Sequence, residues 1–341
     1  MKQLLPAHRL TLLLMAAGAL LIGLFSLSLG RYPIPLKELF VILGHKLTLL
    51  PNIAPVQAEI VLFQVRFPRI AAALLIGGAL SLAGTTYQGL FKNPMISPDI
   101  LGAAAGAGFG AALAILFSWN MAGIQVSAFT FGLLAVMITY FISAAINKGT
   151  HTILILVLTG VLVSTLFTSL ISIIKFTADP FNKLPAITFW LMGGLANISM
   201  HDLRLLSIPL ILGAVPLLLL RWKLNVLCFG EEEARALGLN VKRIRPLIIL
   251  CATLLTAASV AVSGMIGFVG LVIPHMARLL IGPNHRTLLP ASFFLGGAFL
   301  VIVDDAARCI FPVEIPLGIL TSLVGAPFFL FLLMKGRKSW L

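Results

Sequence analysis

The sequence predicts an all-α protein that crosses a membrane about ten times. Three observations carry this prediction: hydrophobic residues make up 60% of the 341-residue chain, charged residues make up only 10%, and the mean hydropathy is +1.08. A soluble domain is about half apolar and about a quarter charged. Apolar stretches of about 20 residues, the length of a membrane-spanning helix, recur along the chain, without the ten-residue alternation of a transmembrane barrel.

Ten apolar segments are the candidate spans. In chain order they are Leu10–Leu29, Pro68–Phe91, Ile100–Ser118, Gln125–Asn147, Thr152–Ile174, Leu205–Leu220, Pro246–Gly264, Phe268–Ala277, Thr287–Val303 and Ile315–Met334. Residues 246–277 contain no Asp, Glu, Lys or Arg and are too many for one span. We therefore predict a full span, a glycine-rich turn at Gly264, Gly267 and Gly270, and a short returning helix.

The first segment has a second interpretation, a signal peptide, because Lys2 and Arg9 precede an apolar run. The run is longer than the apolar core of a signal peptide. Its small-x-small sequence, Ser26-Leu27-Ser28, is also a weak cleavage site. We therefore predict a first span.

Ten spans place both termini on one side of the membrane. Alternate threading puts most of the 24 Lys and Arg residues on that side, which the positive-inside rule assigns to the cytoplasm. The formal net charge of +13 then indicates topology and contact with lipid headgroups, and it requires no nucleic-acid partner. The three scattered Cys residues predict neither a metal site nor a structural disulfide.

Two outer connections are predicted to contain short helices. Residues 31–47 carry Leu36, Leu39, Phe40 and Leu43 at helical spacing, which is typical of a helix lying on the membrane surface. Residues 178–200 contain Pro and Gly pairs around an apolar stretch. We expect a short helix there, tucked against the mouth of a span.

The stretch "FKNPMISPD", residues 91–99, is predicted to be a tight cytoplasmic connection, with Ser97 as a potential cap of the next helix. That helix carries Gly102, Gly106 and Gly110 at four-residue intervals. Such a face lets two helix backbones approach closely. Its resemblance to a nucleotide-binding fingerprint lacks the preceding strand that this interpretation needs.

The stretch "GEEEARALGLNVKRIR", residues 230–245, concentrates charge in an apolar chain. Glu231, Glu232 and Glu233 suit the first turn of a short helix, and Gly238 can adopt the left-handed conformation that ends it. Asn240 is then a potential cap for the next helix. The basic residues Lys242, Arg243 and Arg245 mark the membrane boundary, and Pro246 opens the next span.

Catalytic and cofactor motifs are absent from the sequence. There is no GxxxxGK[ST] loop, no HExxH and no CxxC. The adjacent pair Asp304 and Asp305 would not face one site on a helix. Almost no charged residue falls within a predicted span, which argues against a proton-coupled transporter with an intramembrane carboxylate relay. We predict no catalytic residues, no metal site and no cofactor.

Four long stretches together resemble one family. They are "QVRFPRIAAALLIGGALSLAGTTYQGLFKNPMISPDILG" (64–102), "GEEEARALGL" (230–239), "GMIGFVGLVIPHMARLLIGPNHRTLLP" (264–290) and "EIPLGILTSLVGAPFFLFLL" (314–333). They resemble the FecCD-type permeases, the membrane subunits of ABC importers for ferric siderophores, haem and cobalamin.

The resemblance implies a single permease domain over residues 1–341 with the type II ABC importer fold. It also implies a homodimer in a bacterial or archaeal cytoplasmic membrane, two cytoplasmic ATPase subunits and an external substrate-binding protein. The expected cargo is a metal chelate, foremost a ferric siderophore, with haem, cobalamin or molybdate as alternatives. An ion-coupled secondary transporter is the alternative function.

Three groups of site residues follow from the resemblance. The loop at about 226–245 would couple to the ATPase through Glu231, Glu232, Glu233, Ala234, Arg235, Leu237 and Gly238. Arg66, Arg69 and Arg308 would dock the binding protein, since guanidinium groups bond carboxylates twice; the alternatives are headgroup anchors or, for Arg308, a bond to Asp304 or Asp305. Thr152, Ile153 and Leu154 would form a hydrophobic gate.

Overall fold

The computed structural model describes residues 6–46, 55–146, 152–310 and 313–336. Within these ranges the regular structure is helical throughout. The helices are α1 (Pro6–Ser26), α2 (Leu36–Lys46), α3 (Val56–Ile60), a π-helical turn (Val61–Arg66), α4 (Phe67–Leu90), a 3-10 turn (Pro98–Leu101), α5 (Ala103–Leu116), α6 (Met121–Ile146), α7 (Thr152–Thr177), α8 (Lys183–Met192), α9 (Met200–Leu227), α10 (Glu231–Ala236), α11 (Val241–Ser263), α12 (Val269–Ile281), α13 (His285–Cys309) and α14 (Leu317–Gly336).

The membrane-spanning pattern matches the predicted one. Seven described segments are long and apolar enough to cross a bilayer, and α5, α12 and the described part of α14 are shorter apolar helices. These ten elements correspond in order to the ten predicted segments. The prediction of an all-α membrane protein is thereby confirmed.

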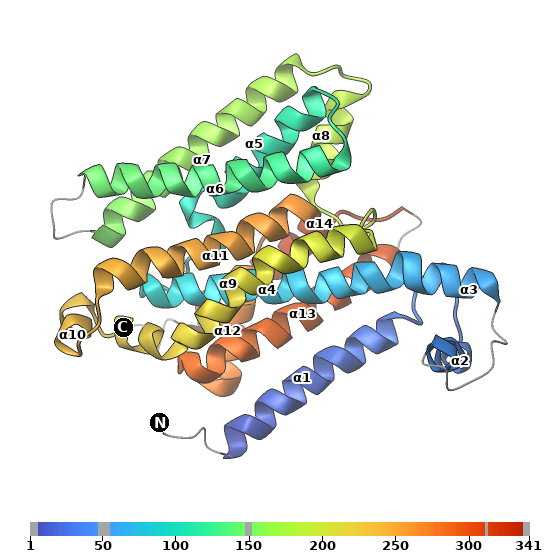
Figure 1. The fold of residues 1–341 in the computed structure, drawn as a ribbon, viewed down its shortest axis with the longest axis horizontal. Coiled ribbons are helices and arrows are strands. Elements are labelled where there is room, and N and C mark those ends of the chain that lie inside the picture. Colours follow the sequence, from blue (N-terminus) through green and yellow to red (C-terminus); the bar gives the residue numbers. More distant parts are fainter. Residues whose placement is uncertain (1–5, 47–54, 147–151, 311–312, 337–341) are drawn as a thin grey trace.

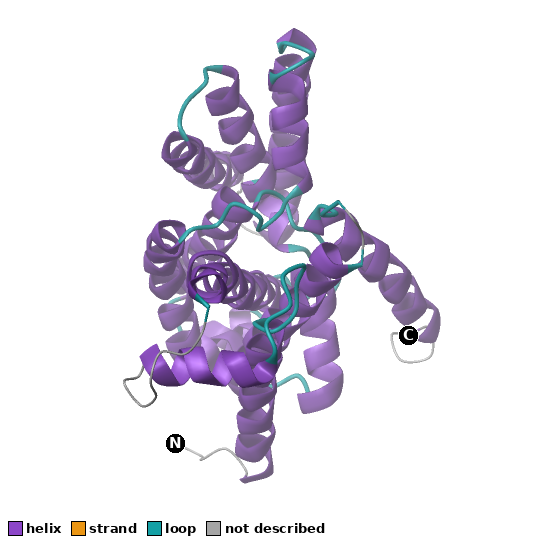
Figure 2. Ribbon diagram, turned by 90° about the vertical axis from the view of Figure 1, so that its right-hand side faces the viewer, coloured by secondary structure: helices purple, strands orange, loops and turns teal. Residues whose placement is uncertain are grey.

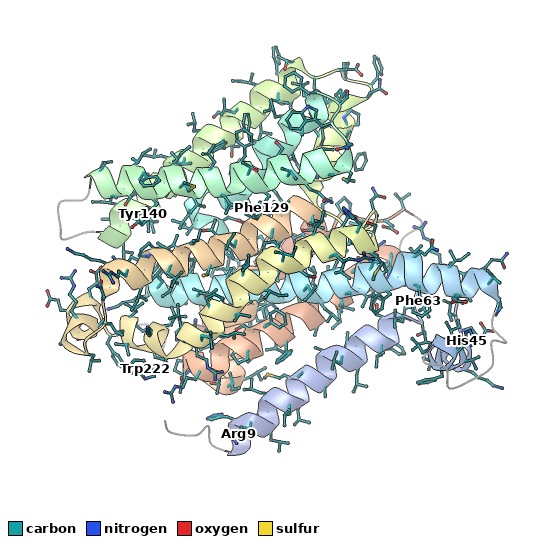
Figure 3. All side chains as sticks on the ribbon, viewed as in Figure 1. Arg9, His45, Phe63, Phe129, Tyr140 and Trp222 are labelled. Atoms are coloured by element: carbon teal, nitrogen blue, oxygen red, sulfur yellow. The ribbon has the colours of Figure 1, made fainter. Side chains whose placement is uncertain are left out.

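The long helices run between two ends of the molecule (Figure 1). The short helix α10 and the start of α1 lie at one end, and α2 and α3 lie at the other. Below, these are called the α10 end and the α2 end. Figure 2 views the molecule from the α2 end, with several helices seen end-on. In Figure 3, Arg9 and Trp222 lie toward the α10 end and His45 toward the α2 end.

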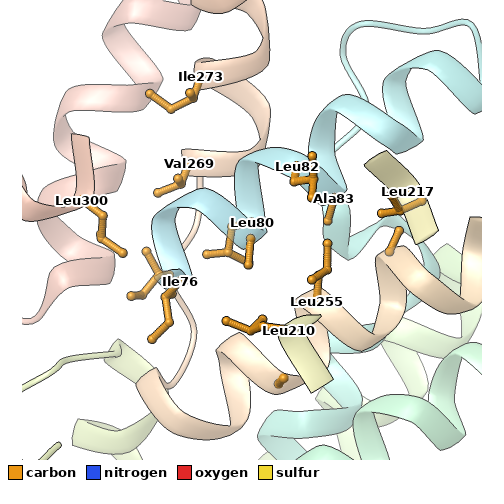
Figure 4. Packing of buried hydrophobic residues seen from close by; sticks show 14 of the residues in the cluster. Ile76, Leu80, Leu82, Ala83, Leu210, Leu217, Leu255, Val269, Ile273 and Leu300 are labelled. Carbon is orange, nitrogen blue, oxygen red and sulfur yellow. The ribbon is translucent and has the colours of Figure 1, made fainter. Parts of the chain in front are cut away.

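The core is built around α4, α11 and α13. In the most apolar 18-residue stretch of each span, half of the residues are buried for the span that contains α4, 72% for α11 and 67% for α13. The corresponding share for α1 is 17%. Figure 4 shows Ile76 and Leu80 of α4 packed among side chains of α9, α11, α12 and α13. Glycines bring these backbones together: a Cβ atom added to Gly84 would lie 1.8 Å from Gly270 O, and one added to Gly77 would lie 2.2 Å from Gly296 O. The central helices can pack this closely only because these positions carry no side chain.

Two helices begin earlier than predicted. The second span continues outward without a break through the π-helical turn to Val56, since no Gly or Pro interrupts residues 56–67. The turn precedes Pro68, which supplies no backbone N–H, and such turns absorb this loss. Helix α11 begins at Val241 and not at Pro246, because Asn240 caps it by accepting a hydrogen bond from Arg243 N. The predicted cap at Asn240 is confirmed.

The predicted glycine face is confirmed at two of its three positions. Cβ atoms added to Gly106 and Gly110 would lie 2.4 Å from Phe131 O and 2.5 Å from Ser127 O, both in α6. Gly102 has a different role, because it stands before α5 with φ 90°. Ser97 does not cap α5 as predicted: it precedes the 3-10 turn and its side chain makes no cap bond.

Candidate functional sites

The helix α10 forms a short, well-terminated knob at one end of the molecule. Gly238 has φ +79°, the left-handed conformation predicted from the sequence. Its N–H donates to Arg235 O at 2.9 Å, and Leu239 N–H donates to Ala234 O at 2.9 Å. This pair of bonds is the Schellman motif, which satisfies the last carbonyls of a helix. Ala234 is fully buried beneath the motif, so the knob has a fixed shape.

Side-chain bonds join the knob to α11. Glu231 Oε1 accepts a hydrogen bond from the Arg245 guanidinium, and Glu231 Oε2 lies 3.3 Å from Arg235 Nη2. Arg245 is the better buried of the two arginines, with 11% of its side chain exposed against 57% for Arg235. Because Arg245 lies in the first turns of α11, this contact ties α10 to a core helix.

The knob presents a mixed surface to solvent. Glu232, Glu233 and Arg235 are exposed, and so are Phe229 (72%) and Leu237 (62%). Large exposed apolar side chains rimmed by charge are typical of a protein interaction site. The coupling role of these residues stays a prediction; of the predicted set, Ala234 is buried, whereas Gly238 is exposed at the end of the helix.

Arg66, Arg69 and Arg308 lie together near the α2 end, and all three are buried. They are 4%, 6% and 6% exposed. Arg66 Nη1 donates to Leu27 O at 2.7 Å, and its Nη2 donates to Tyr32 O. Arg66 thus fixes the end of α1 and the turn after it.

Arg69 is held between two carboxylates. Its Nε lies 3.0 Å from both oxygens of Asp304, and its Nη1 lies 3.0 Å from Glu314 Oε2. Asp304 is 1% exposed, whereas 37% of the Glu314 side chain is exposed. Arg69 and Glu314 also line a cavity of about 490 Å³ together with Trp190 and Asn197.

Arg308 bonds to the neighbouring acid and to α1. Its Nη2 donates to Ser26 O at 2.9 Å and also to Asp305, and Ser26 Oγ lies 2.6 Å from Asp305 Oδ1. Asp304 and Asp305 therefore serve one ion cluster, contrary to the prediction that adjacent acids would not share a site. Asp304 pairs with both Arg69 and Arg308, and Asp305 pairs with Arg308.

The burial of the three arginines bears on their predicted docking role. A guanidinium that already bonds carboxylates or carbonyls inside the subunit would have to exchange those partners to contact another protein. The alternative that Asp304 or Asp305 holds Arg308 within the subunit is present in the structure, with both acids in contact with it. Of the carboxylates in this cluster, Glu314 is the most exposed, with 37% of its side chain exposed against 15% for Asp305.

A third site lies along α7. Ser164, Thr165, Thr168, Ser169 and Ser172 line an open cavity of about 510 Å³ together with Asp99. Thr165, Thr168, Ser169 and Ser172 are exposed, and their hydroxyl groups donate to carbonyls four residues earlier. These hydroxyls and Asp99 give this face of α7 a polar surface beside the cavity.

The connection between α4 and α5 returns to the middle of the bundle. Ile96 O accepts a bond from Gln88, near the end of α4. Further along, Pro98 lies against Gly270, whose added Cβ would also meet Leu80 O at 2.7 Å. Leu80 is ten residues from the end of α4 at Leu90, which is about 15 Å at 1.5 Å per residue. If Leu90 marks the edge of a 30 Å hydrocarbon layer, the 3-10 turn sits about halfway through that layer.

The predicted tight connection followed by a new helix is present, with a 3-10 turn between them that folds back along α4. Irregular backbone is tolerated at membrane depth only where protein covers it or where it lines a water-filled cavity. Here both conditions operate: Thr139 of α6 donates to Leu101 O at 3.0 Å, while Asp99 faces the cavity. Sequence reasoning did not single out Asp99, because the apolar segment 100–118 begins directly after it and gives no sign of the turn that carries it.

The predicted gate residues begin α7, at the same end as α10. Ile153 is half-buried and packs against the main core, whereas Leu154 is 57% exposed. Thr152 is the first residue of α7, and the structure describes only its backbone. Leu154, together with Leu158 (55% exposed), continues the open face of α7 toward this end as an apolar surface. Apolar side chains such as Leu154 and Leu158 can close a narrow pore by excluding water.

Comparison with known proteins identifies the family. The model of the FecCD transport family matches residues 18–335. The molybdate import system permease protein MolB of Haemophilus influenzae is 40% identical over 97% of this chain and 95% of its own length. The cobalamin import system permease protein BtuC of Halobacterium salinarum is 37% identical, over 93% of this chain and 94% of its own length.

A solved structure agrees with these relatives. It is an inward-facing structure of an ABC transporter described as being of the metal-chelate type, with a TM-score of 0.84 and 36% sequence identity, covering 96% of this chain and 99% of that one. The type II ABC importer permease fold predicted from the resemblance is thereby confirmed. From its family match, its relatives and its fold, this chain belongs to the FecCD transport family.

Proposed function

We propose that this chain is the permease subunit of an ABC importer that moves a metal chelate into the cytoplasm. Two copies would form the pathway, two ATPase subunits would bind on the cytoplasmic side, and an external binding protein would deliver the cargo. Membership of the FecCD family supports the class of transporter. An ion-coupled secondary transporter is not favoured by the comparisons.

The observation that carries this proposal is the α10 knob. It is ended by a Schellman motif at Gly238, tied to α11 by Glu231 and Arg245, and covered by exposed charged and apolar side chains. A rigid handle of this kind suits the transfer of motion from an ATPase. Binding of nucleotide and of loaded binding protein would then shift an inward–outward equilibrium by differential affinity for the two states.

The membrane orientation is inferred from charge. The α10 end carries Arg235, Lys242, Arg243 and the start of α1 with Arg9, so the positive-inside rule places that end in the cytoplasm. Both termini would then be cytoplasmic. The α2 end, with the arginine cluster and the cavity beside Glu314, would face outward and receive the binding protein.

The pathway would run between two copies of α7. The hydroxyl stripe and its cavity are open in one subunit, and a second copy related by twofold symmetry would enclose them. Thr152, Ile153 and Leu154 would narrow the path at the cytoplasmic end, where apolar side chains can close a pore by excluding water. The homodimer and the gate are parts of the same proposal.

The cargo is proposed to be a siderophore-type iron chelate. The similar permeases carry names for molybdate, iron chelatin, cobalamin and haemin, so the family alone leaves a choice. The iron chelate is preferred because permeases named for iron chelatin and for iron(3+)-hydroxamate are among the similar proteins.

The test is reconstitution of the chain with its ATPase and its binding protein in proteoliposomes. Cargo identity would come from mass spectrometry of the ligand that co-purifies with the binding protein. Uptake should require ATP and the loaded binding protein. Uptake driven by an ion gradient without the ATPase would instead support the secondary transporter.

A further inference from the structure

Asp99 is the acidic residue that the fold brings to the middle of the membrane. It lies in the 3-10 turn between α4 and α5 and lines the cavity whose other wall is the hydroxyl stripe of α7. Lys and Arg are absent from the residues that line this cavity. Within the described chain, no residue donates a hydrogen bond to the Asp99 carboxylate or pairs with it. A charged group at this depth with no partner inside its own subunit is functional by default.

The surroundings of Asp99 determine which solutes the cavity favours. The hydroxyls of Thr165, Thr168, Ser169 and Ser172 have already donated their hydrogens to the α7 backbone, so the lone pairs of their oxygens face the cavity as acceptors. A carboxylate adds further acceptors and a full negative charge. The wall is therefore rich in acceptors.

One feature opposes this charge. The first N–H groups of α5 begin beside the cavity at Ala104 and Ala105, and a helix N-terminus carries about half a positive charge. The positive charge at the helix N-terminus is about half the size of the negative charge on a carboxylate. The electrostatic potential in the cavity beside Asp99 therefore stays negative. The helix end therefore weakens the negative potential of the carboxylate at the cavity without cancelling it.

We propose that Asp99 and the α7 hydroxyls form a solute-contact site at the middle of the pathway, which favours cationic and hydrogen-bond-donating solutes and disfavours free oxyanions. This inference rests on the proposed function, because the cavity must belong to the pathway. Protonated amines, amide and hydroxyl groups and metal-bound water are the donors that such a wall would accept. A chelate that presents them would pass more readily than a bare tetrahedral oxyanion.

The test measures the charge preference of the cavity without knowledge of the cargo. Thr168→Cys is introduced into the full chain with Cys228, Cys251 and Cys309 replaced by Ser, and the permease is assembled with its ATPase in proteoliposomes. A trimethylammonium-ethyl and a sulfonato-ethyl methanethiosulfonate serve as the cationic and anionic probes. Asp99→Asn should lower the ratio of cationic to anionic reaction rates about tenfold, because the charge acts on the two probes in opposite directions.

Matched variants test whether the effect is specific to Asp99. Asp99→Glu keeps the charge and should keep the ratio of cationic to anionic reaction rates. Asp179→Asn, which removes an exposed acid beyond the far end of α7, should also leave this ratio unchanged. Thr130→Cys on the exposed face of α6 should react with neither probe. An unchanged ratio in Asp99→Asn, or a Thr168→Cys that is as unreactive as Thr130→Cys, would overturn the proposal.

The same samples separate this inference from the proposed function. ATP hydrolysis stimulated by loaded binding protein is measured alongside the labelling. If loaded binding protein stimulates ATP hydrolysis but Asp99→Asn leaves the ratio of labelling rates unchanged, the site is rejected and the importer assignment stands. Absence of stimulation in the unsubstituted chain would reject the importer, whatever the labelling shows.

Discussion

Arg69 and Asp304 form a buried ion pair across 235 residues of sequence, with Arg69 Nε 3.0 Å from both carboxylate oxygens. The pair joins α4 to α13, the two helices that also pack through Gly77 and Gly296. Arg69 Nη2 also bonds to Asp304, and its Nη1 bonds to Glu314 in the segment before α14. One side chain thus holds three parts of the chain together near the α2 end.

Asp304→Asn is expected to destabilise the protein strongly. Removing one partner of a buried ion pair leaves an uncompensated charge and costs about 3–5 kcal/mol. Glu314→Gln is the matched control: its side chain is 37% exposed, so water can replace the lost bond and the cost should be under about 1 kcal/mol. Thermal unfolding of the detergent-solubilised protein measures both. Equal losses of stability would show that Arg69 does not depend on Asp304.

Gly238→Val is expected to uncouple the ATPase while leaving the subunit folded. The added side chain meets no atom within 4 Å, so the cost comes from the left-handed backbone alone, about 1–2 kcal/mol. That strain opposes the turn that ends α10. The ATPase activity stimulated by loaded binding protein should fall severalfold.

Gly238→Asn is the control for this experiment, because Asn adopts the left-handed conformation readily. It should retain most of the stimulation. Size-exclusion chromatography of the permease with its ATPase separates loss of assembly from loss of coupling. Full stimulation in Gly238→Val would remove α10 from the coupling pathway.

The end of α10 could be predicted from sequence because its cause is local. Three carboxylates at the start of a helix and a glycine after its last turn specify that helix within eight residues, and the structure has Glu231–Ala236 with Gly238 at φ +79°. The ten spans were predictable for a similar reason, because hydropathy is a property of each segment alone.

The arginine cluster and Asp99 could not be predicted in the same way, because their roles depend on distant residues. Arg69 near a span boundary is compatible with a headgroup anchor, a docking group or an internal ion pair, and only the packing of α4 against α13 shows that the ion pair is formed. Similarly, "FKNPMISPD" has the composition of a surface loop. Its depth is set by contacts of Pro98 and Leu101 with α12, α4 and α6.

Gly84→Ala is expected to damage the core although it adds only one methyl group. The new Cβ would lie 1.8 Å from Gly270 O, a backbone atom that cannot move without shifting α12. Overpacking of this kind typically costs about 1–3 kcal/mol. Gly18→Ala in α1 is the control, since nothing lies within 4 Å of the added atom; it should be neutral or stabilise by up to about 1 kcal/mol. Yield and thermal stability after purification should rank Gly18→Ala above Gly84→Ala, and the reverse order would contradict the packing of α4 on α12.

Leu154→Cys is expected to form a disulfide between two copies of the chain. If the α7 helices meet at the cytoplasmic end of a homodimer, the two Leu154 positions face each other, and a disulfide requires Cα atoms within about 7 Å. The chain would carry Ser in place of Cys228, Cys251 and Cys309, and oxidation in native membranes would be monitored on non-reducing gels.

Phe141→Cys is the matched control for this cross-link. Phe141 is 62% exposed against 57% for Leu154, and it lies near the same end of the molecule on α6, whose last described residue is Ile146. It should stay monomeric, because the proposed dimer axis passes along α7. Cross-linked Leu154→Cys should also lose uptake that a reducing agent restores, since a closed gate blocks passage. Cross-linking of Phe141→Cys in place of Leu154→Cys would put the dimer contact on α6 and remove the gate from Thr152–Leu154.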